Sequence, residues 1–169
     1  MDKIDINKVG AKLEEVFADK VQVQGEPQGI LQLQVDKKYI IELLGFLKND
    51  PELKFIFLTD ITAVHYPDFE KDQQMCVVYH IHSLENNIRV RIKVFINGDN
   101  PTIDSATVLW HGANWMERET FDFFGVKFIG HPDLRRILNM DELNVHPMRK
   151  EYPLEDPNRV DKKDFYFGR

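Results

Sequence analysis

Three carboxylates in one short segment could support acid–base chemistry. Glu117, Glu119 and Asp122 are close enough in sequence for one to donate a proton while another accepts one. All three, however, fall within about two turns of one expected helix, and the sequence indicates no cleft beside them. The two glutamates suit the positive end of the helix dipole, and Arg118 stands four residues before Asp122, the spacing of an ion pair. We therefore favour a structural role, with a small stand-alone enzyme as an alternative.

Two of the six histidines, His80 and His82, lie two residues apart in a segment with strand character, so they share one face. Two imidazoles in this arrangement could begin a metal site, but the sequence supplies no third ligand. Their strand is expected to pair with the strand that carries Arg89, Arg91 and Lys93, whose cations would oppose a divalent metal. A polar sheet surface, facing solvent or a partner, is the favoured interpretation.

Residues for other common chemistry are missing. Cys76 is the single cysteine, so the chain cannot form an internal disulfide, hold an iron–sulfur cluster or build a thiolate zinc site. It lies in an apolar run, which favours a buried thiol that acts as a small hydrophobic group. Glycine-rich phosphate loops and nucleophile motifs are absent. We expect the chain to bind no cofactor and to contribute no catalytic residue.

Size and charge exclude further classes of protein. The 169 residues, of which 43% are hydrophobic, suffice for one packed domain plus a tail or for two small domains. A net charge of −6 argues against nucleic-acid binding, which needs a cationic surface to displace counterions. No signal peptide is visible, and no window approaches the roughly 20 apolar residues of a membrane span. We expect neither a nucleic-acid partner nor a direct membrane span.

Helical periodicity indicates the elements that would carry these residues. It predicts four helical segments, over residues 7–20, 37–49, 104–110 and 115–124. Asn7, Asp36 and Asn114 are the expected N-caps of the longer three, and Glu117 follows Asn114 at the spacing of a capping box. Gly125 is expected to end the last helix.

Alternating hydrophobicity predicts five strands, over residues 21–24, 30–35, 55–64, 75–84 and 88–96. Glycine and proline between the first two indicate a hairpin or two short separate strands. The third is a nearly continuous apolar run, which predicts a strand covered on both faces. In the last, the isoleucines and valines face the core while Arg89, Arg91 and Lys93 face outward. The expected fold class is α+β, with helices packed on a mixed sheet of about four to five strands and an extended C-terminal arm.

The pattern changes beyond residue 130. We expect a globular domain over residues 1–130 and an extended arm over 131–169, because prolines and charges dominate there and apolar residues occur singly or in pairs. Tyr152 and the run Phe165-Tyr166-Phe167 are poorly suited to a solvated tail. Docking of the arm on a partner subunit is favoured over disorder, since a partner would bury these aromatic rings.

Three segments also resemble one known family, and the first, residues 57–67, is similar to the strand that precedes the family's central loop. Residues 115–138 contain Glu-Arg-Glu, then an acid with two large apolar residues, then His-Pro and an arginine, and residues 146–154 contain His-Pro-Met-Arg-Lys-Glu-Tyr-Pro-Leu. This pattern is similar to the signature of the thirty-kilodalton subunit family, a component of the peripheral arm of respiratory complex I. The residues that carry it are Glu117, Arg118, Glu119, Asp122, Gly125, His131, Pro132, Arg135, His146, Pro147, Arg149, Lys150, Tyr152 and Pro153. Two departures are Val145, where many members have glycine, and Met148, where leucine is usual.

The resemblance implies a non-catalytic subunit of NADH:quinone oxidoreductase. Such subunits bind no cofactor, whereas NADH, flavin, iron–sulfur clusters and quinone are bound by partner subunits. The implied partners are the large quinone-site subunit and the subunit that holds the terminal iron–sulfur cluster. The implied location is peripheral, on the cytoplasmic side of the bacterial inner membrane or the matrix side in mitochondria. The signature residues would lie at this interface, so Arg118→Ala is expected to impair assembly. The matching subunit of a membrane-bound nickel–iron hydrogenase or a ferredoxin-linked complex is an alternative.

Overall fold

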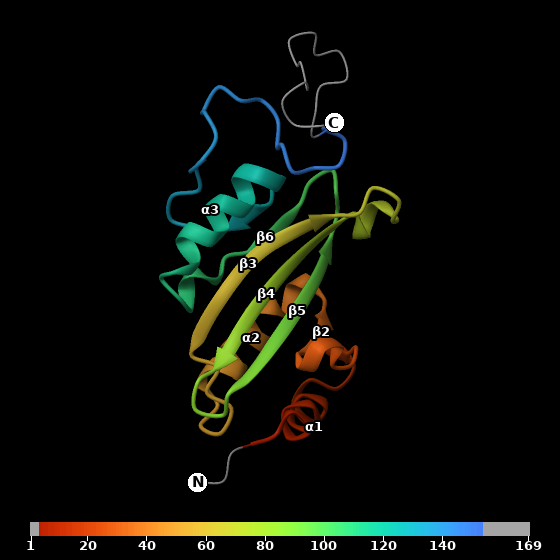
Figure 1. The fold of residues 1–169 in the computed structure, drawn as a ribbon, viewed down its shortest axis with the longest axis vertical. Helices are drawn as coiled ribbons and strands as arrows, with labels where there is room; N and C mark the ends of the chain where they lie inside the picture. Colours follow the sequence, from red (N-terminus) through yellow and green to blue (C-terminus); the bar gives the residue numbers. More distant parts are fainter. Residues whose placement is uncertain (1–3, 154–169) are drawn as a thin grey trace, which may run out of the picture.

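A five-stranded mixed sheet forms the centre of the molecule (Figure 1). The computed structural model describes residues 4–153 of the chain. The strands stand in the order β1-β2-β5-β4-β3, with β2 and β5 parallel and the other neighbours antiparallel. Their bounds are β1 Val21–Val23, β2 Leu31–Val35, β3 Phe57–His65, β4 Met75–Ser83 and β5 Ile88–Ile96. The predicted hairpin and the mixed sheet are confirmed.

Alternation of side chains gives this sheet two different faces. In β5 the isoleucines and valines are buried, whereas Arg89, Arg91 and Lys93 point to the other side, as the sequence predicts. The antiparallel register places His80 opposite Arg91 and His82 opposite Arg89. Because directly opposed residues lie on the same face, the imidazoles and the cations share one surface.

Three helices and the apolar face of the sheet enclose a single core. The helices are α1 Ile6–Phe17, α2 Ile40–Asn49 and α3 Ala113–Phe124. Leu13 of α1, Leu43 of α2 and Phe124 of α3 belong to the same buried cluster as Tyr79 of β4. Among residues 4–153, the opposite face of the sheet contributes no side chain to that cluster. The arrangement confirms the α+β class.

Two helix starts differ in detail from the prediction. The side chain of Asp5, rather than Asn7, caps α1 by accepting a hydrogen bond of 2.9 Å from the backbone N–H of Lys8. Asp36 caps as predicted and accepts from the N–H of Lys38 at 3.0 Å, but the turn that follows is a 3-10 helix that leads into α2. Either aspartate or asparagine can satisfy a free N–H, so sequence alone could not choose between neighbouring candidates.

The expectation that the third strand is covered on both faces is wrong. β3 is an edge strand, and its exposure alternates, with Leu58 buried and Phe57 half exposed. The helices cover only one of its faces, so the second face remains open. Helix α3 lies beside β3, where the Thr120 hydroxyl donates to the carbonyl of Ile61 at 3.1 Å. This bond satisfies a carbonyl at the sheet edge.

A second, smaller sheet was not predicted. Strands β6 Thr102–Asp104 and β7 Lys127–Ile129 are parallel and three residues each, too short to show periodicity. The helix predicted over 104–110 is a single 3-10 turn, η5 Ala106–Val108, and the Ser105 side chain caps it by accepting from the N–H of Thr107 at 3.1 Å. This small sheet and turn connect β5 to α3 and return the chain from α3.

The C-terminal arm passes over α3 without regular structure. Residues 131–153 contain turns and bends but no helix or strand, and they run along the outer side of α3 (Figure 1). The aromatic run at 165–167 lies outside the described residues. Within residues 4–153, no helix has the length and apolar character needed to cross a membrane.

Candidate functional site

Helix α3 places three signature residues, Glu117, Arg118 and Asp122, between the domain and the arm. Its last residue is followed by Gly125, which adopts φ +78° and donates its N–H to the carbonyl of Phe121, so the predicted C-terminal cap is confirmed. The side chains of Glu117, Arg118 and Asp122 are all buried. A charged side chain that is removed from water needs partners, and those partners identify what the helix holds.

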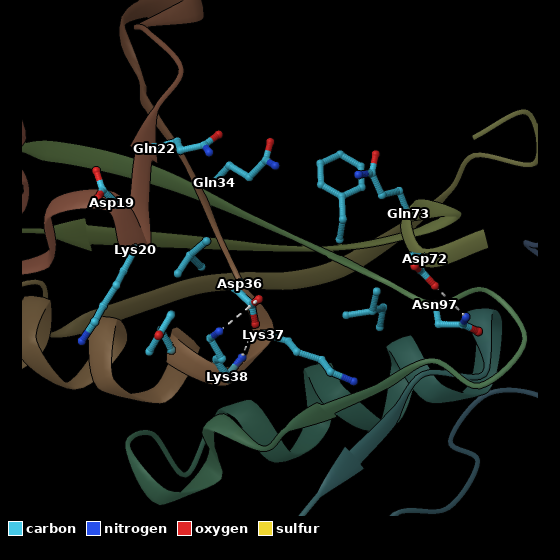
Figure 2. A pocket seen from close by; sticks show the side chains of 14 residues that line it. Asp19, Lys20, Gln22, Gln34, Asp36, Lys37, Lys38, Asp72, Gln73 and Asn97 are labelled. Atoms are coloured by element: carbon cyan, nitrogen blue, oxygen red, sulfur yellow. Dashed lines mark hydrogen bonds and ion pairs between the residues drawn. The ribbon is translucent and has the colours of Figure 1, made fainter. Parts of the chain in front are cut away.

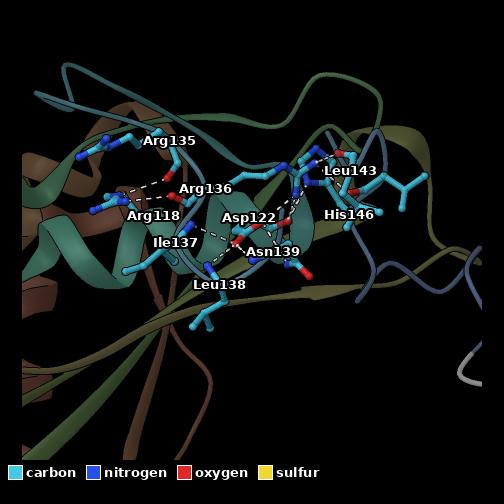
Figure 3. A network of polar contacts seen from close by, with 10 residues as sticks. Arg118, Asp122, Arg135, Arg136, Ile137, Leu138, Asn139, Leu143 and His146 are labelled. Atoms are coloured by element: carbon cyan, nitrogen blue, oxygen red, sulfur yellow. Dashed lines mark hydrogen bonds and ion pairs between the residues drawn. The ribbon is translucent and has the colours of Figure 1, made fainter. Parts of the chain in front are cut away.

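Asp122 binds the arm through five hydrogen bonds to its carboxylate (Figure 3). The backbone N–H groups of Ile137, Leu138 and Asn139 donate at 3.1, 2.9 and 2.9 Å, and the Asn139 amide donates at 3.1 Å. Arg136 completes the set with an ion pair of 2.7 Å. Burial alone would raise the pKa of Asp122, but these bonds outweigh it and hold the pKa far below its usual range.

Arg136 extends the same network along the arm. Its guanidinium also donates to the carbonyls of Asp122, at 3.2 Å, of Leu143 and of Val145, at 3.0 Å. The His146 ring lies 2.9 Å from the Asp122 carbonyl through Nδ1. One nearly buried arginine therefore fixes two separate stretches of an otherwise irregular segment. We call Asp122, Arg136 and the arm groups bonded to them the arm clamp.

The predicted Arg118–Asp122 ion pair is wrong, because Arg118 turns to backbone carbonyls instead. It donates to the carbonyls of Arg135 and Arg136 at 3.2 and 2.9 Å (Figure 3). Its guanidinium lies 5.3 Å from the centre of the Trp115 ring, a cation–π distance. Within the part of the chain that the structure describes, no carboxylate lies within ion-pair distance of Arg118. This side chain is thus a second anchor for the start of the arm.

Glu117 faces the domain and not the arm. Its carboxylate accepts from the Ser105 hydroxyl and from the N–H of Ala106, both at 2.6 Å. The predicted capping box is wrong, because α3 begins at Ala113 and Asn114 lies inside it. Burial raises the pKa of Glu117 to about 7, although its two hydrogen bonds oppose the shift.

The carboxylates of α3 do not form an acid–base pair. Glu117 points to η5, Asp122 points to the arm and Glu119 is exposed to solvent. The structure therefore separates the three carboxylates that the sequence places side by side.

The hydroxyl of Tyr79 is fully buried and has no hydrogen-bond partner in residues 4–153, and burial together with the nearby Glu117 charge raises the pKa of this hydroxyl.

The C-terminal end of α3 contacts the second signature segment. Arg149 donates to the carbonyl of Phe124 at 2.7 Å, so a cation lies at the negative end of the helix dipole. A Cβ atom on Gly125 would fall 2.6 Å from the His146 ring, so glycine is required both by its backbone conformation and by this close approach. The N–H of Lys150 donates to His65 at 3.0 Å, which connects the arm to the end of β3.

The other signature residues of the arm have smaller roles. His131 accepts from the N–H of Asp133 at 3.0 Å and lies 3.2 Å from the carbonyl of Asn114. Arg135 is exposed and pairs with Asp133 at 2.9 Å. The signature residues that remain, Pro132, Pro147, Lys150, Tyr152 and Pro153, also make no side-chain hydrogen bond to α3, and of these only Pro147 is half-buried.

The arm presents four large apolar side chains to solvent. The exposed fractions are 67% for Leu138, 71% for Met140 and 53% for Met148, and Tyr152 is also exposed. Leu138 follows Ile137 in the part of the arm that is bonded to Asp122. The clamp therefore fixes the backbone while leaving apolar groups outward.

Two cavities of the described residues lie away from the arm clamp. One, of about 620 Å³, lies where β2 and β5 end (Figure 2). Charged residues of both signs line it, among them Asp19, Lys20, Asp36, Lys37, Lys38 and Asp72. In Figure 2 the side chains of Asp36 and Lys38 pair with each other and do not converge with the other charged groups on one point where a ligand could bind. The second cavity lies beside α1.

Comparison with known proteins decides the family. The family model described as respiratory-chain NADH dehydrogenase, 30 Kd subunit, matches residues 33–158. The chain belongs to this family. The NADH-quinone oxidoreductase C subunit of Citrifermentans bemidjiense is 43% identical over 153 residues, which cover 90% of this chain and 92% of the relative. A C subunit of the same enzyme from Rhizobium etli is 43% identical over 145 residues, covering 85% and 75% of the two chains.

Solved structures agree on the fold of this member of the 30 Kd subunit family. A trypsin-resistant fragment of Nqo5 superposes with a TM-score of 0.65 at 29% identity, covering 75% of this chain and 99% of the fragment. A chain of the archaeal membrane-bound sulfane sulfur reductase gives 0.71 at 23% identity, covering 88% and 85%. The second likeness shows a shared fold alone.

Sequence reasoning missed two residues that this family member uses at α3. Arg136 makes the ion pair with Asp122, whereas the neighbouring Arg135, which was predicted, points to solvent. Ser105 supplies the partner for Glu117. Consecutive arginines give no signal of which one is buried.

Among residues 4–153, no group of three or more histidine, cysteine or acidic side chains is placed to hold a metal ion. Cys76 is buried, as predicted.

Proposed function

We propose that this chain is a non-catalytic structural subunit of the peripheral arm of NADH:quinone oxidoreductase. It braces the large quinone-site subunit, next to the subunit with the terminal iron–sulfur cluster, so that electrons pass from NADH through the clusters to quinone. Flavin, clusters, NADH and quinone belong to those partners. The relatives, which are named as C subunits of NADH-quinone oxidoreductase, support this role and favour it over a hydrogenase or ferredoxin-linked complex.

One observation carries the proposal. The arm has no regular structure, yet Asp122, Arg136 and Arg118 hold its backbone in one conformation while Leu138 and Met140 face solvent. Fixing a backbone before binding lowers the entropy cost of association. Exposed apolar groups on a rigid segment are typical of a surface that a partner covers. The arm clamp thus prepares residues 131–153 for docking.

The stand-alone enzyme has no such support. An acid–base mechanism needs two groups within reach of one substrate, and Glu117, Glu119 and Asp122 point to three different surroundings.

The similar solved structure at 29% identity is a trypsin-resistant fragment that covers 75% of this chain. This supports a division into a globular domain, over residues 1–130, and an arm, over 131–169, that docks on a partner subunit. We place the chain peripherally, on the cytoplasmic side of the bacterial inner membrane, or on the matrix side in mitochondria.

The direct test removes the apolar surface and leaves the arm clamp intact. Leu138→Gln combined with Met140→Gln replaces two exposed side chains, so the free chain keeps its stability. If a partner buries both groups, the loss of about 1.5–3 kcal/mol each weakens association at least tenfold. The measurement is recovery of the quinone-site subunit with the tagged full-length chain, together with NADH:quinone reductase activity of the membranes.

The matched control is Leu84→Gln. Leu84 is 55% exposed and belongs to the β4–β5 turn. This turn lies at the other end of the sheet from the arm (Figure 1). The control variant is expected to assemble normally. Full recovery of the quinone-site subunit with the double variant would refute docking through this surface.

Arg118→Ala tests the anchor from the other side. Its loss frees the carbonyls of Arg135 and Arg136, so the arm loosens while the isolated domain stays folded. Impaired assembly of the peripheral arm with an unchanged circular dichroism spectrum is expected. Normal assembly and reductase activity would count against the role of this residue.

A further inference from the structure

The second face of the sheet is a surface that the arm clamp does not use. The register assigns to it one row of alternate residues from each strand, and we call this surface the open face. Its residues are Gln22, Gln32, Gln34, Phe57, Asp60, Thr62, Val64, Cys76, Val78, His80, His82, Arg89, Arg91, Lys93 and Phe95. Tyr66 and Phe69 stack near Phe95 and cover one end of it. The remainder is not part of the core cluster.

The open face carries positive charge that the described part of the chain does not neutralise. Arg89, Arg91 and Lys93 follow one another on β5, and none of them pairs with a carboxylate of residues 4–153. Asp60 is the single carboxylate that these five strands place on this face, and it lies 3.9 Å from His80. Three cations at alternate positions of one strand repel each other. The chain as a whole is acidic, with a net charge of −6, so the concentration of cations here is local.

The polar groups of this face are held in place but not fully bonded. Arg91 donates through Nε to His80 Nε2 at 2.9 Å, which orients its guanidinium. Burial lowers the pKa of His80, as does the Arg91 charge, while Asp60 opposes them. His82 Nε2 is buried and has no hydrogen-bond partner in the described residues. Half-buried cations and an unpaired imidazole nitrogen leave hydrogen-bonding capacity for another molecule.

We propose that the open face is a docking surface for an acidic polypeptide segment of a neighbouring subunit, and this inference rests on the chain's proposed role in a complex. Carboxylates of that segment would pair with Arg89, Arg91 and Lys93. The three glutamines of β1 and β2, beside this basic row, offer both donors and acceptors to a peptide backbone.

The size of the face suits a protein partner. Strands about 4.8 Å apart with a rise of about 3.3 Å per residue give a surface of roughly 500 Å². Since Tyr66 and Phe69 cover one end of it, the free area corresponds to the smaller class of protein interfaces, which bury under about 600 Å² on each partner. A single-stranded nucleic acid would need several exposed aromatic rings on the groove, and the uncovered part of this face has one, Phe57.

Carbodiimide cross-linking of the purified intact complex tests the proposal at one atom. The reagent joins an amine to a carboxylate in contact with it and adds no spacer. We expect Lys93 to be coupled to an aspartate or glutamate of another subunit, identified by mass spectrometry. Coupling only to carboxylates of this same chain, or acetylation of Lys93 in the complex at the rate seen in the isolated chain, would overturn the proposal.

Charge reversal gives a second, independent readout. Arg91→Glu with Lys93→Glu is expected to lower at least tenfold the recovery of the chain in the complex. Lys8→Glu, on the outer side of α1, is the control and should assemble normally. Recovery of the charge-reversed variant at the level of the Lys8→Glu control and of wild type would overturn docking at the open face. Benzonase treatment that releases the wild-type chain would show a nucleic acid instead and also overturn it. If the wild-type chain is recovered with no other subunit, the proposed function itself fails, so the two failures are distinguishable.

Discussion

The sheet domain and the arm are stabilised in opposite ways. In the domain, three helices bury an apolar cluster against one face of the sheet, and polar groups play a small part. In the arm, residues 131–153 form no helix or strand, several apolar side chains remain exposed, and the polar arm clamp holds the backbone. The difference supports the proposal that the domain is stable on its own and that a partner covers the arm.

Helix α3 contacts both the domain and the arm, and it does so through two buried carboxylates. Glu117 faces the domain and Asp122 faces the arm, and neither side chain is accessible to solvent. Burial raises the pKa of both, yet only that of Glu117 ends above its usual range, because it accepts two hydrogen bonds while Asp122 accepts five that include an arginine. Hydrogen-bond donors oppose burial at both carboxylates, and only at Asp122 do they outweigh it.

Asp122→Asn is expected to have the largest effect on this comparison. It removes the charge opposite Arg136, whose side chain is only 11% exposed, and breaking one partner of a buried pair costs about 3–5 kcal/mol. Urea unfolding measures the free energy, and trypsin cleavage after Arg135 and Arg136 reports release of the arm. Unchanged cleavage would contradict the clamp.

The exposed pair Asp133–Arg135 supplies the control for that variant. Asp133→Asn should alter neither urea unfolding nor cleavage measurably, because exposed ion pairs contribute little to stability.

Measuring the free energy of unfolding at several pH values tests in which direction Asp122 changes stability. Since the folded-state pKa of Asp122 is depressed, its stabilisation is present above the unfolded value of about 3.9 and is lost as the pH falls below it.

A core substitution should affect the domain and not the arm specifically. Leu43→Ala removes a fully buried side chain of α2, at a cost of about 2–5 kcal/mol. Hydrogen exchange should then accelerate throughout the sheet, while trypsin cleavage of the arm under native conditions stays close to wild type. Selective release of the arm by this variant would show that the two regions are not separately stabilised.

Glu117→Gln tests the domain side of α3 through pH. The folded-state pKa of about 7 lies above the unfolded value of about 4.3, so the native state holds its proton more tightly and loses stability as the pH rises through this window. Glutamine keeps the shape but cannot ionise. The stability of the variant relative to wild type should therefore increase between pH 5 and pH 8, by on the order of 2–3 kcal/mol. A constant difference would refute the raised pKa.

Apart from the control Asp133→Asn, Gly125→Ala should have the smallest effect, a loss of about 2 kcal/mol in the free energy of unfolding. An alanine at φ +78° is strained, and its Cβ would meet the His146 ring at 2.6 Å. Loss of stability with displacement of the His146 ring, seen as changed NMR shifts, is expected. Adding His146→Ala should recover the steric part only. If the double variant is no better than the single one, the backbone strain alone accounts for the cost.

Much of the domain could be predicted because its signals are periodic. Alternation in β5 indicated which side carries Arg91, and the glycine after α3 marked its end. The arm clamp could not be read in the same way. Three of the groups that bind Asp122 are backbone N–H groups, at Ile137, Leu138 and Asn139, and every residue type except proline offers one. Whether Arg135 or Arg136 faces α3 depends on the path that the arm backbone takes, and no local sequence pattern reports that path.

Methionine oxidation in the assembled complex tests the central claim most directly. Met140 and Met148 are exposed on the arm, whereas Met75 is fully buried in β4 and serves as an internal reference. With limited peroxide, both arm methionines of the isolated chain should oxidise quickly and Met75 slowly. In the intact complex, we predict that Met140 and Met148 become protected nearly to the level of Met75. Oxidation of both at the rate of the isolated chain would contradict the account, because the arm would then face solvent and brace no partner.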